Sequence, residues 1–229
     1  MKIWFETSSL KQSLLTFHPS ALLLAVQLFQ LAIFMFFDQL PHRQTSITII
    51  GMLVLLLVVW VVNHSPGTNW IAWSLAIPAF ALSIVSGVIP DASLSAWSAL
   101  LQGLLYLYGA SSLIAYMMED DEVTTDEVYA AAATFTLLAW GFAFFYLACQ
   151  FWLPLSFSSA LFPHRASTFL ELLSLSFTNL TATGLSDIVP VNASARVLVM
   201  MEQFLGIGYV AVVVSRLVGM TLQRKKIKS

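Results

Sequence analysis

Long apolar runs separated by short polar segments are the main pattern along the chain. A helix needs about 20 apolar residues to cross the hydrocarbon core of a bilayer, which is about 30 Å thick. The pattern therefore predicts six transmembrane helices and an all-α membrane protein. The runs lie near residues 20–37, 47–62, 70–89, 94–118, 128–151 and 193–220.

The composition agrees with this pattern. Hydrophobic residues make up 59% of the chain and charged residues only 10%, unlike a water-soluble domain. Six spans use most of the 229 residues, so we expect no separate soluble domain. An even number of spans places both termini on one side of a cell membrane. The Lys and Arg residues of the tail at 223–229 favour the cytoplasmic side, and this short tail does not indicate a nucleic-acid partner.

Charges and apolar runs divide the chain into four regions. Residues 1–118 hold four predicted helices, residues 119–127 form an acidic linker, and residues 128–222 hold the last two helices. The basic tail follows at 223–229. Span four, near 94–118, contains no Lys or Arg, so it lacks the regularly spaced positive charges of a voltage sensor. We therefore expect little voltage sensitivity from it.

The acidic linker allows two interpretations. A solvated charge run at a helix N-terminus is the commoner case. A site for a divalent cation or for a basic partner is the alternative. The residues concerned are Glu119, Asp120, Asp121, Glu122, Asp126 and Glu127.

The segment between the last two predicted helices is unusually polar. The run TFLELLSLSFTNL, residues 168–180, is too short to cross a bilayer as a helix, and TATGLSD follows at 181–187. Non-helical backbone survives at membrane depth only when it is buried in protein or lines water, because each unpaired amide or carbonyl in hydrocarbon costs several kcal/mol. We therefore expect a re-entrant helix and then a loop that lines an aqueous path.

The stretch SFTNLTATGLSDIVPVNASARVLVMMEQFLGIGYVAVVVSRLVGM resembles the pore loop and inner helix of the potassium-channel superfamily. That family's filter signature is T-T-V-G-Y-G-D, and Pro190, Arg196 and Gly206 match further family positions. The resemblance covers residues 125–222, and the upstream spans carry no matching motif. The signature places are taken here by Thr181, Ala182, Thr183, Gly184, Leu185, Ser186 and Asp187.

The resemblance implies a passive cation channel whose pore domain is residues 128–222. In that family, rings of backbone carbonyls replace the hydration shell of the permeant ion, and four loops form each ring. Because the chain carries one such loop, the resemblance implies a homotetramer within membrane lipid. K⁺ is the expected permeant ion, Na⁺ is a second candidate, and no organic cofactor is implied. The expected K⁺ ligands are the backbone carbonyls of Ala182, Thr183, Gly184 and Leu185.

Three filter positions depart from the family. Ala182 replaces a threonine whose hydroxyl contributes to the innermost ion site, and Leu185 replaces a tyrosine that braces the filter from behind. Ser186 replaces a glycine at a position that usually has a positive φ, where another residue costs on the order of 1 kcal/mol. Three interpretations stay open: a K⁺-preferring channel, a weakly selective cation channel, and a non-conducting structural or sensory subunit. Asp187 is retained at the outer mouth, where a ring of carboxylates concentrates cations.

The sixth predicted helix supplies the candidate gate. Gly206 and Gly208 indicate either a hinge or close helix packing, and glycine serves both purposes in membrane helices. An apolar face at helical spacing would form the pore wall and close it by dewetting. Its members are Ile207, Val210, Val214 and Val218.

Three charged residues accompany the pore segment. Glu202 lies inside the last span, where it is either a functional group or a hydrogen-bonded group packed behind the pore helix. Glu171 lies in the first turn of the short helix, where its charge offsets the positive end of the helix dipole. Arg216 is expected to extend to the lipid headgroups.

Enzymatic and transporter alternatives have little support in the sequence. No H-E-x-x-H or G-x-S-x-G motif occurs, and no pair of aspartates lies within a span. A secondary transporter would show related halves with matching broken helices, whereas the spans here are interrupted once. The histidines lie in loops or at span ends: His18, His42, His64 and His164.

Overall fold

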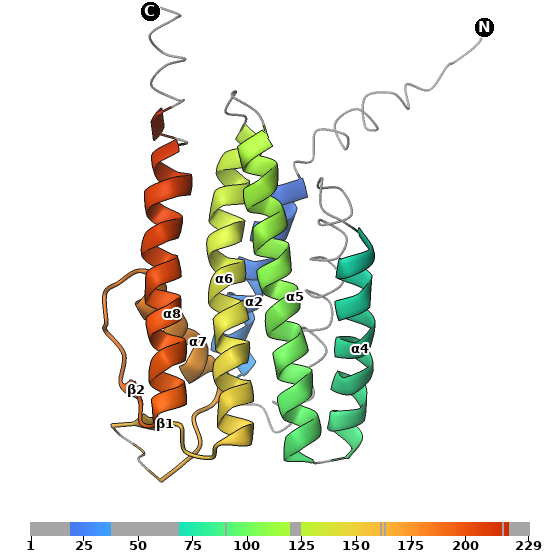
Figure 1. Ribbon diagram of the computed structural model, residues 1–229, viewed down its shortest axis with the longest axis vertical. Coiled ribbons are helices and arrows are strands. Elements are labelled where there is room, and N and C mark those ends of the chain that lie inside the picture. The colour runs from blue at the N-terminus through green and yellow to red at the C-terminus, as the bar shows by residue number, and fades with distance from the viewer. Residues whose placement is uncertain are drawn as a thin grey trace, which may run out of the picture.

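The computed structural model shows a bundle of long helices with one short helix packed among them (Figure 1). It describes residues 19–37, 69–89, 91–119, 125–160, 162, 164–216 and 218–219. The helices are α2 (Pro19–Phe37), α4 (Asn69–Val88), α5 (Ala92–Glu119), α6 (Thr125–Trp152), α7 (Phe169–Leu180) and α8 (Ala193–Tyr209). Helix α8 continues as a π-helix, η1 (Val210–Val214), and two short strands are β1 (Phe157–Ser159) and β2 (Ile188–Pro190).

Several described helices are long and apolar enough to cross a membrane. They are Trp70–Val88, Ala92–Glu119, Asp126–Trp152 and Ala193–Val214, and α2 carries a shorter apolar stretch, Ser20–Phe34. The chain is therefore a multi-pass membrane protein. The predicted spans near 20–37, 70–89, 94–118, 128–151 and 193–220 each coincide with a helix, whereas the span predicted near 47–62 lies outside the described residues.

Helix α6 is the centre of the bundle. It packs against α2, α5, α7 and α8, and 78% of its apolar window is buried, compared with 28% for the last span. The Trp140 ring stacks at 5.9 Å on Phe34 of α2 and at 6.2 Å on Tyr106 of α5. Aromatic side chains of three helices thus form one continuous core.

Close approach of α5 to α6 depends on two glycines. A Cβ atom on Gly103 would lie 2.7 Å from the Phe145 ring and 3.0 Å from the Gly141 carbonyl oxygen. Small residues at such crossings let two helix backbones approach and increase their van der Waals contact. The Gly103 position therefore sets the distance between α5 and α6.

Contacts along the helices fix their directions. Helix α2 runs parallel to α6, because the Ser20 hydroxyl donates to Asp126 at 2.9 Å near the start of both helices, and Phe34 meets Trp140 further along. Helix α5 runs antiparallel to α6, because Trp97 packs on Trp152 at 5.3 Å.

Helix α4 in turn runs antiparallel to α5, since the hydroxyls of Ser83 and Ser98 lie 2.9 Å apart. Helices α2 and α4 therefore point the same way (Figure 1). Helix α2 ends at one end of the bundle, and α4 begins at the other.

The sequence favours interpreting the acidic linker as a solvated charge run at a helix N-terminus. Asp126 and Glu127 do lie in the first turn of α6, but the expected solvation is wrong for both. Asp126 is 7% exposed and Glu127 2% exposed, because the first turn of α6 is packed between neighbouring helices. Asp126 accepts hydrogen bonds from Ser20 and from the Tyr116 hydroxyl, at 2.9 and 3.3 Å. Glu119 is exposed, and residues 120–124 lie outside the described part of the chain.

A pair of short strands adds to the all-α architecture expected from the sequence. Strands β1 and β2 pair antiparallel, with Ser159 opposite Ile188 and Phe157 opposite Pro190. Because β1 precedes α7 and β2 follows the loop after it, the segment between them leaves and returns at the same end of the bundle (Figure 1). The predicted re-entrant segment is thus present in the fold.

Replacing Gly103 by alanine tests the α5–α6 contact. We expect Gly103→Ala to lower the free energy of unfolding by about 1–3 kcal/mol, because the Phe145 ring or the whole helix must shift. Thermal unfolding in detergent, followed by circular dichroism, measures the change. Gly87→Ala is the matched control, since its added methyl meets no atom within 4 Å. Equal stability of the two variants would contradict the packing argument.

Candidate ion-conduction site

The short helix α7 begins with a complete capping box. The Thr168 hydroxyl accepts from the Glu171 amide at 3.3 Å, and the Glu171 carboxylate accepts from the Thr168 amide at 2.6 Å. Two otherwise unpaired amides at the helix start are thereby satisfied. Helix α7 is 12 residues long, so the prediction that this run is too short to cross the bilayer is confirmed.

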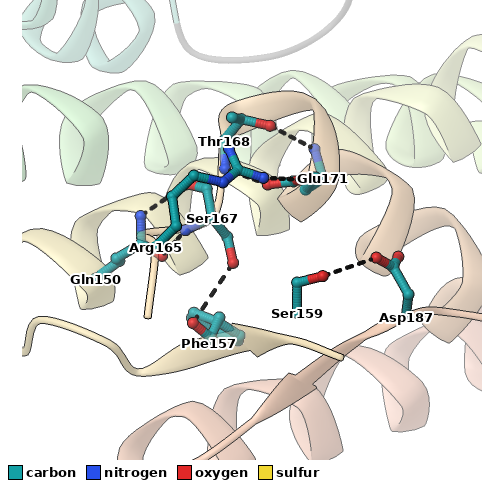
Figure 2. A network of polar contacts seen from close by, with 8 residues as sticks. All are labelled: Gln150, Phe157, Ser159, Arg165, Ser167, Thr168, Glu171 and Asp187. Atoms are coloured by element: carbon teal, nitrogen blue, oxygen red, sulfur yellow. Dashed lines mark hydrogen bonds and ion pairs between the residues drawn. The ribbon is translucent and has the colours of Figure 1, made fainter. Parts of the chain in front are cut away.

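Glu171 also forms an ion pair at the surface of the protein. Arg165 donates to the Glu171 carboxylate, as Figure 2 shows. Partial burial alone would raise the pKa of the Glu171 carboxyl, but hydrogen bonds from the Thr168 backbone and from Arg165 outweigh it and lower the pKa. The carboxylate at the positive end of the helix dipole is therefore kept charged, which supports the structural role predicted for Glu171.

Beyond α7 the backbone makes a compact turn tied to the end of the helix. The Thr178 carbonyl accepts from the amides of Thr183 and Gly184, at 3.0 and 3.3 Å. Ala182 has φ 54° and Gly184 has φ 65°, so both residues adopt the left-handed conformation. This reversal lets the chain turn back immediately after the helix ends.

The strain expected at Ser186 lies elsewhere. Ser186 is not among the residues with positive φ, whereas Ala182 is, so the conformational cost of a non-glycine residue falls on Ala182. The Ser186 hydroxyl instead accepts from the Ile188 amide at 3.1 Å. This local bond stabilises an ordinary backbone conformation at a position where the resemblance implied a left-handed one.

The proposed filter residues lie together on the surface of the single chain. The hydroxyls of Thr181 and Thr183 are 3.1 Å apart, Ala182 and Gly184 are exposed, and Leu185 is 83% exposed. A run of exposed, mostly non-helical backbone thus follows directly after α7. It has the chemistry of a segment that meets water or ions instead of lipid.

Asp187 is held by residues that sequence reasoning missed. The Ser159 hydroxyl donates to the Asp187 carboxylate at 3.1 Å, and the Ala160 amide donates to the Asp187 backbone carbonyl at 3.0 Å. Figure 2 shows Ser159 and Asp187 facing each other from β1 and from the segment entering β2. No sequence signal marked Ser159, because three residues are too few to show the alternation of a strand.

Glu202 joins three helices behind the pore segment. Its side chain is fully buried and accepts hydrogen bonds from the Tyr146 hydroxyl of α6 and the Ser176 hydroxyl of α7. The Asn179 side-chain amide donates to it at 3.3 Å. The interpretation of Glu202 as a hydrogen-bonded group packed behind the pore helix is confirmed.

Gly206 provides a second contact between α8 and α7. A Cβ atom there would lie 2.6 Å from the Leu180 carbonyl oxygen, whereas a Cβ on Gly208 would meet no atom within 4 Å. The structure therefore supports close packing as the reason for Gly206. Glu202 and Gly206, one helical turn apart, hold the last turn of α7 against the inner helix.

The inner helix has one packed face and one open face. Its buried residues recur at helical spacing: Ala195, Val199, Glu202, Gly206, Tyr209 and Val213. The residues predicted to line the pore lie among the exposed ones, with exposures of 61%, 50%, 37% and 54% for Ile207, Val210, Val214 and Val218. Part of this open face falls in the π-helix η1, a geometry often found at functional sites.

The C-terminal end of the last span contacts α5. Arg216 donates to the Met117 backbone carbonyl and lies 3.4 Å from the Met118 sulfur. Its guanidinium therefore binds the C-terminal turn of α5, where helix carbonyls lack helical partners. The extension of Arg216 to the lipid headgroups stays a prediction.

Comparison with known families gives one match. Residues 132–223 match a family model described as an ion channel. The C-terminal region thus resembles a pore-loop cation channel. The match favours a transport protein over an enzyme and includes α7, the exposed turn and α8. No curated protein and no solved structure matches the chain.

Alanine substitution distinguishes packing from hinge bending at Gly206. We expect Gly206→Ala to lower the free energy of unfolding by about 1–3 kcal/mol, because the new methyl collides with the Leu180 backbone. If Gly206 acts only as a hinge, its replacement by alanine should instead raise the stability of the helix by up to about 1 kcal/mol. Chemical denaturation in detergent checks the sign, and Gly208→Ala, whose methyl meets open space, is the control.

Removing the Glu202 carboxylate tests the three-helix contact. We expect Glu202→Leu to lower the free energy of unfolding by about 1–3 kcal/mol, because the buried Tyr146 hydroxyl loses its acceptor. Glu202→Gln keeps one acceptor oxygen but points its amide N–H groups at side chains that are themselves donors. We therefore expect an intermediate loss of stability. Thermal unfolding measures both, and wild-type stability of the leucine variant would contradict the role assigned to Glu202.

Proposed function

We propose that the protein conducts monovalent cations passively across the membrane, with K⁺ preferred, through a filter formed by residues 181–187 of four identical chains. The observation that carries this proposal is the exposed turn after α7, in a re-entrant segment that leaves and returns at one end of the bundle. The match of residues 132–223 to an ion-channel family supports it.

The electrostatics of the segment favour a cation. Helix α7 ends at Leu180, so the negative end of its dipole lies next to residues 181–184. Backbone carbonyls in this turn would replace the hydration shell of the permeant ion. The proposed K⁺ ligands are the carbonyls of Ala182, Thr183, Gly184 and Leu185, and the carboxylates of Asp187 would concentrate cations at the mouth.

A single chain cannot surround an ion with this turn. Several copies are needed to close a ring of carbonyls, and we propose four, the number that the resemblance to potassium channels implies. The open apolar face of α8 would then line the central pore, with Ile207, Val210, Val214 and Val218 as its wall. A constriction of apolar side chains can close such a pore by dewetting.

The directions of the helices support six spans with both termini in the cytoplasm. Helices α2 and α4 point the same way, so a further crossing between them completes an alternating topology. The end of α5, the start of α6 and the end of the last span lie together, since Tyr116 contacts Asp126 and Arg216 contacts Met117. The basic tail favours the cytoplasm for this end, so Asp187 would lie on the opposite, outer side.

Weak selectivity is the second candidate, because the innermost ion site lacks a threonine. Ala182 has no hydroxyl and carries the left-handed strain, so this site would hold K⁺ less firmly. The Thr181 and Thr183 hydroxyls beside it offer alternative oxygens. The K⁺ preference therefore depends on whether these hydroxyls replace the missing one.

The reversal potential under opposed K⁺ and Na⁺ gradients tests the proposal. With the purified protein in planar bilayers, we expect reversal near the K⁺ equilibrium potential, and Asp187→Asn should lower the conductance severalfold at low ionic strength. The loss should be smaller at high salt, because salt screens exposed charges.

The other outcomes separate the remaining interpretations. Clear current with reversal near zero would establish a weakly selective cation pore. The conducting role would be overturned if no K⁺ current is seen and K⁺ also fails to raise the thermal stability of the protein. Ions that bind a folded filter must stabilise it. This binding measurement does not depend on an open gate.

A further inference from the structure

Strand β1 contacts the entry to the re-entrant segment. The Gln150 side chain of α6 forms two hydrogen bonds with the backbone of Ser167, of 2.9 and 3.0 Å. Ser167 in turn lies with its hydroxyl 3.5 Å from the Phe157 carbonyl of β1. Phe157 is fully buried and packs on Tyr146 at 4.9 Å. One end of β1 is thus fixed to α6 and to the start of α7 (Figure 2).

The other end of β1 contacts the exit. The Ser159 hydroxyl and the Ala160 amide donate to the side chain and the backbone of Asp187, at 3.1 and 3.0 Å. Ser159 is only 3% exposed, whereas Asp187 is exposed, so packing fixes the position of the donor while the carboxylate remains open to water. Asp187 is therefore held at two points from outside the pore helix.

We propose that Ser159 is a positioning residue for the filter, and that Phe157, Ser159 and Ala160 form an outer brace linking the entry and exit of the re-entrant segment. The inference rests on the proposed function, because a brace has a functional effect only if residues 181–187 bind ions. The brace supplies a hydrogen bond at the outer filter that Leu185 cannot make with its hydrocarbon side chain.

The physical effect of the brace is to restrict the last filter residues. Two bonds to one residue fix both the position of its backbone and the direction of its carboxylate. Without the side-chain bond, Asp187 can rotate toward water and the carbonyls just before it gain freedom. Discrimination between ions of different size depends on how narrowly such carbonyls are held.

Removal of the Ser159 hydroxyl tests the brace. We expect Ser159→Ala to lower the K⁺/Na⁺ permeability ratio, and to raise the K⁺ concentration that gives half of the K⁺-dependent thermal stabilisation, each by about three- to tenfold. This is the effect of losing one hydrogen bond of ordinary net strength, as expected for an acceptor that is open to water. Ser159→Thr keeps the hydroxyl and should restore both values. Ser159→Cys has only a weak S–H donor and should shift both values in the same direction as Ser159→Ala. It replaces the alanine variant in this test if that variant does not fold.

Ser158→Ala is the matched control, because successive side chains of a strand point to opposite faces. It should leave both values unchanged. If Ser159 acts through Asp187, then Ser159→Ala should cause no further change in an Asp187→Ala background. Wild-type values for Ser159→Ala, or additive effects in the double variant, would overturn the inference while leaving ion conduction intact. Absence of K⁺ flux and of K⁺ stabilisation in the wild type would overturn the proposed function itself.

Discussion

Backbone amides and carbonyls at membrane depth must find partners, and residues 181–187 have no regular helix of their own to supply them. The local solution is the Thr178 carbonyl, which accepts from the amides of Thr183 and Gly184. On the far side, Asp187 is paired to β1. Between these attachments the turn is exposed on the single chain, so its remaining polar groups need water, ions or other copies. The need for those partners explains why so polar a segment can occur in so apolar a chain.

The same constraint determines how the inner helix packs. A pore helix of 12 residues is too short to be anchored by lipid at both ends, so it depends on neighbouring helices. Glu202 binds it through hydrogen bonds, and Gly206 lets the Leu180 backbone approach α8 directly. The N-terminal part of α8 and the end of α7 therefore form one packed unit. Bending of α8 is easiest after Gly206, where the helix changes to the π-helix Val210–Val214.

Much of this fold could be predicted from hydrophobic runs, whereas contacts between distant segments could not. The length of the apolar runs predicted α4, α5, α6 and α8, and the short apolar run before a polar loop predicted α7. Burial of Asp126 depends on where α2 and α5 lie, and no local pattern contains that information. Similarly, the backbone conformations of Ala182 and Ser186 accompany hydrogen bonds that the residue types did not reveal. The Ala182 amide donates to the Asn179 carbonyl, and the Ser186 hydroxyl accepts from the Ile188 amide. The strand pair was not predicted, because a strand of three residues is too short to show the alternation of buried and exposed side chains.

Helix α6 lies between the N-terminal helices and the C-terminal region, and it contacts both through uncharged side chains. Its Trp140 touches α2 and α5 on one side, while its Tyr146 reaches Glu202 of α8. Tight packing transmits displacement because interiors are dense and have few voids. Span four lacks Lys and Arg, so a membrane potential has no fixed positive charge within that span to move. A shift of α5 would act on the last span through two routes, the α6 core and the bond between Arg216 and Met117. The upstream helices thus contact the region that matches the ion-channel family by packing, and the second route meets the last span after Gly206, on the side of the π-helix.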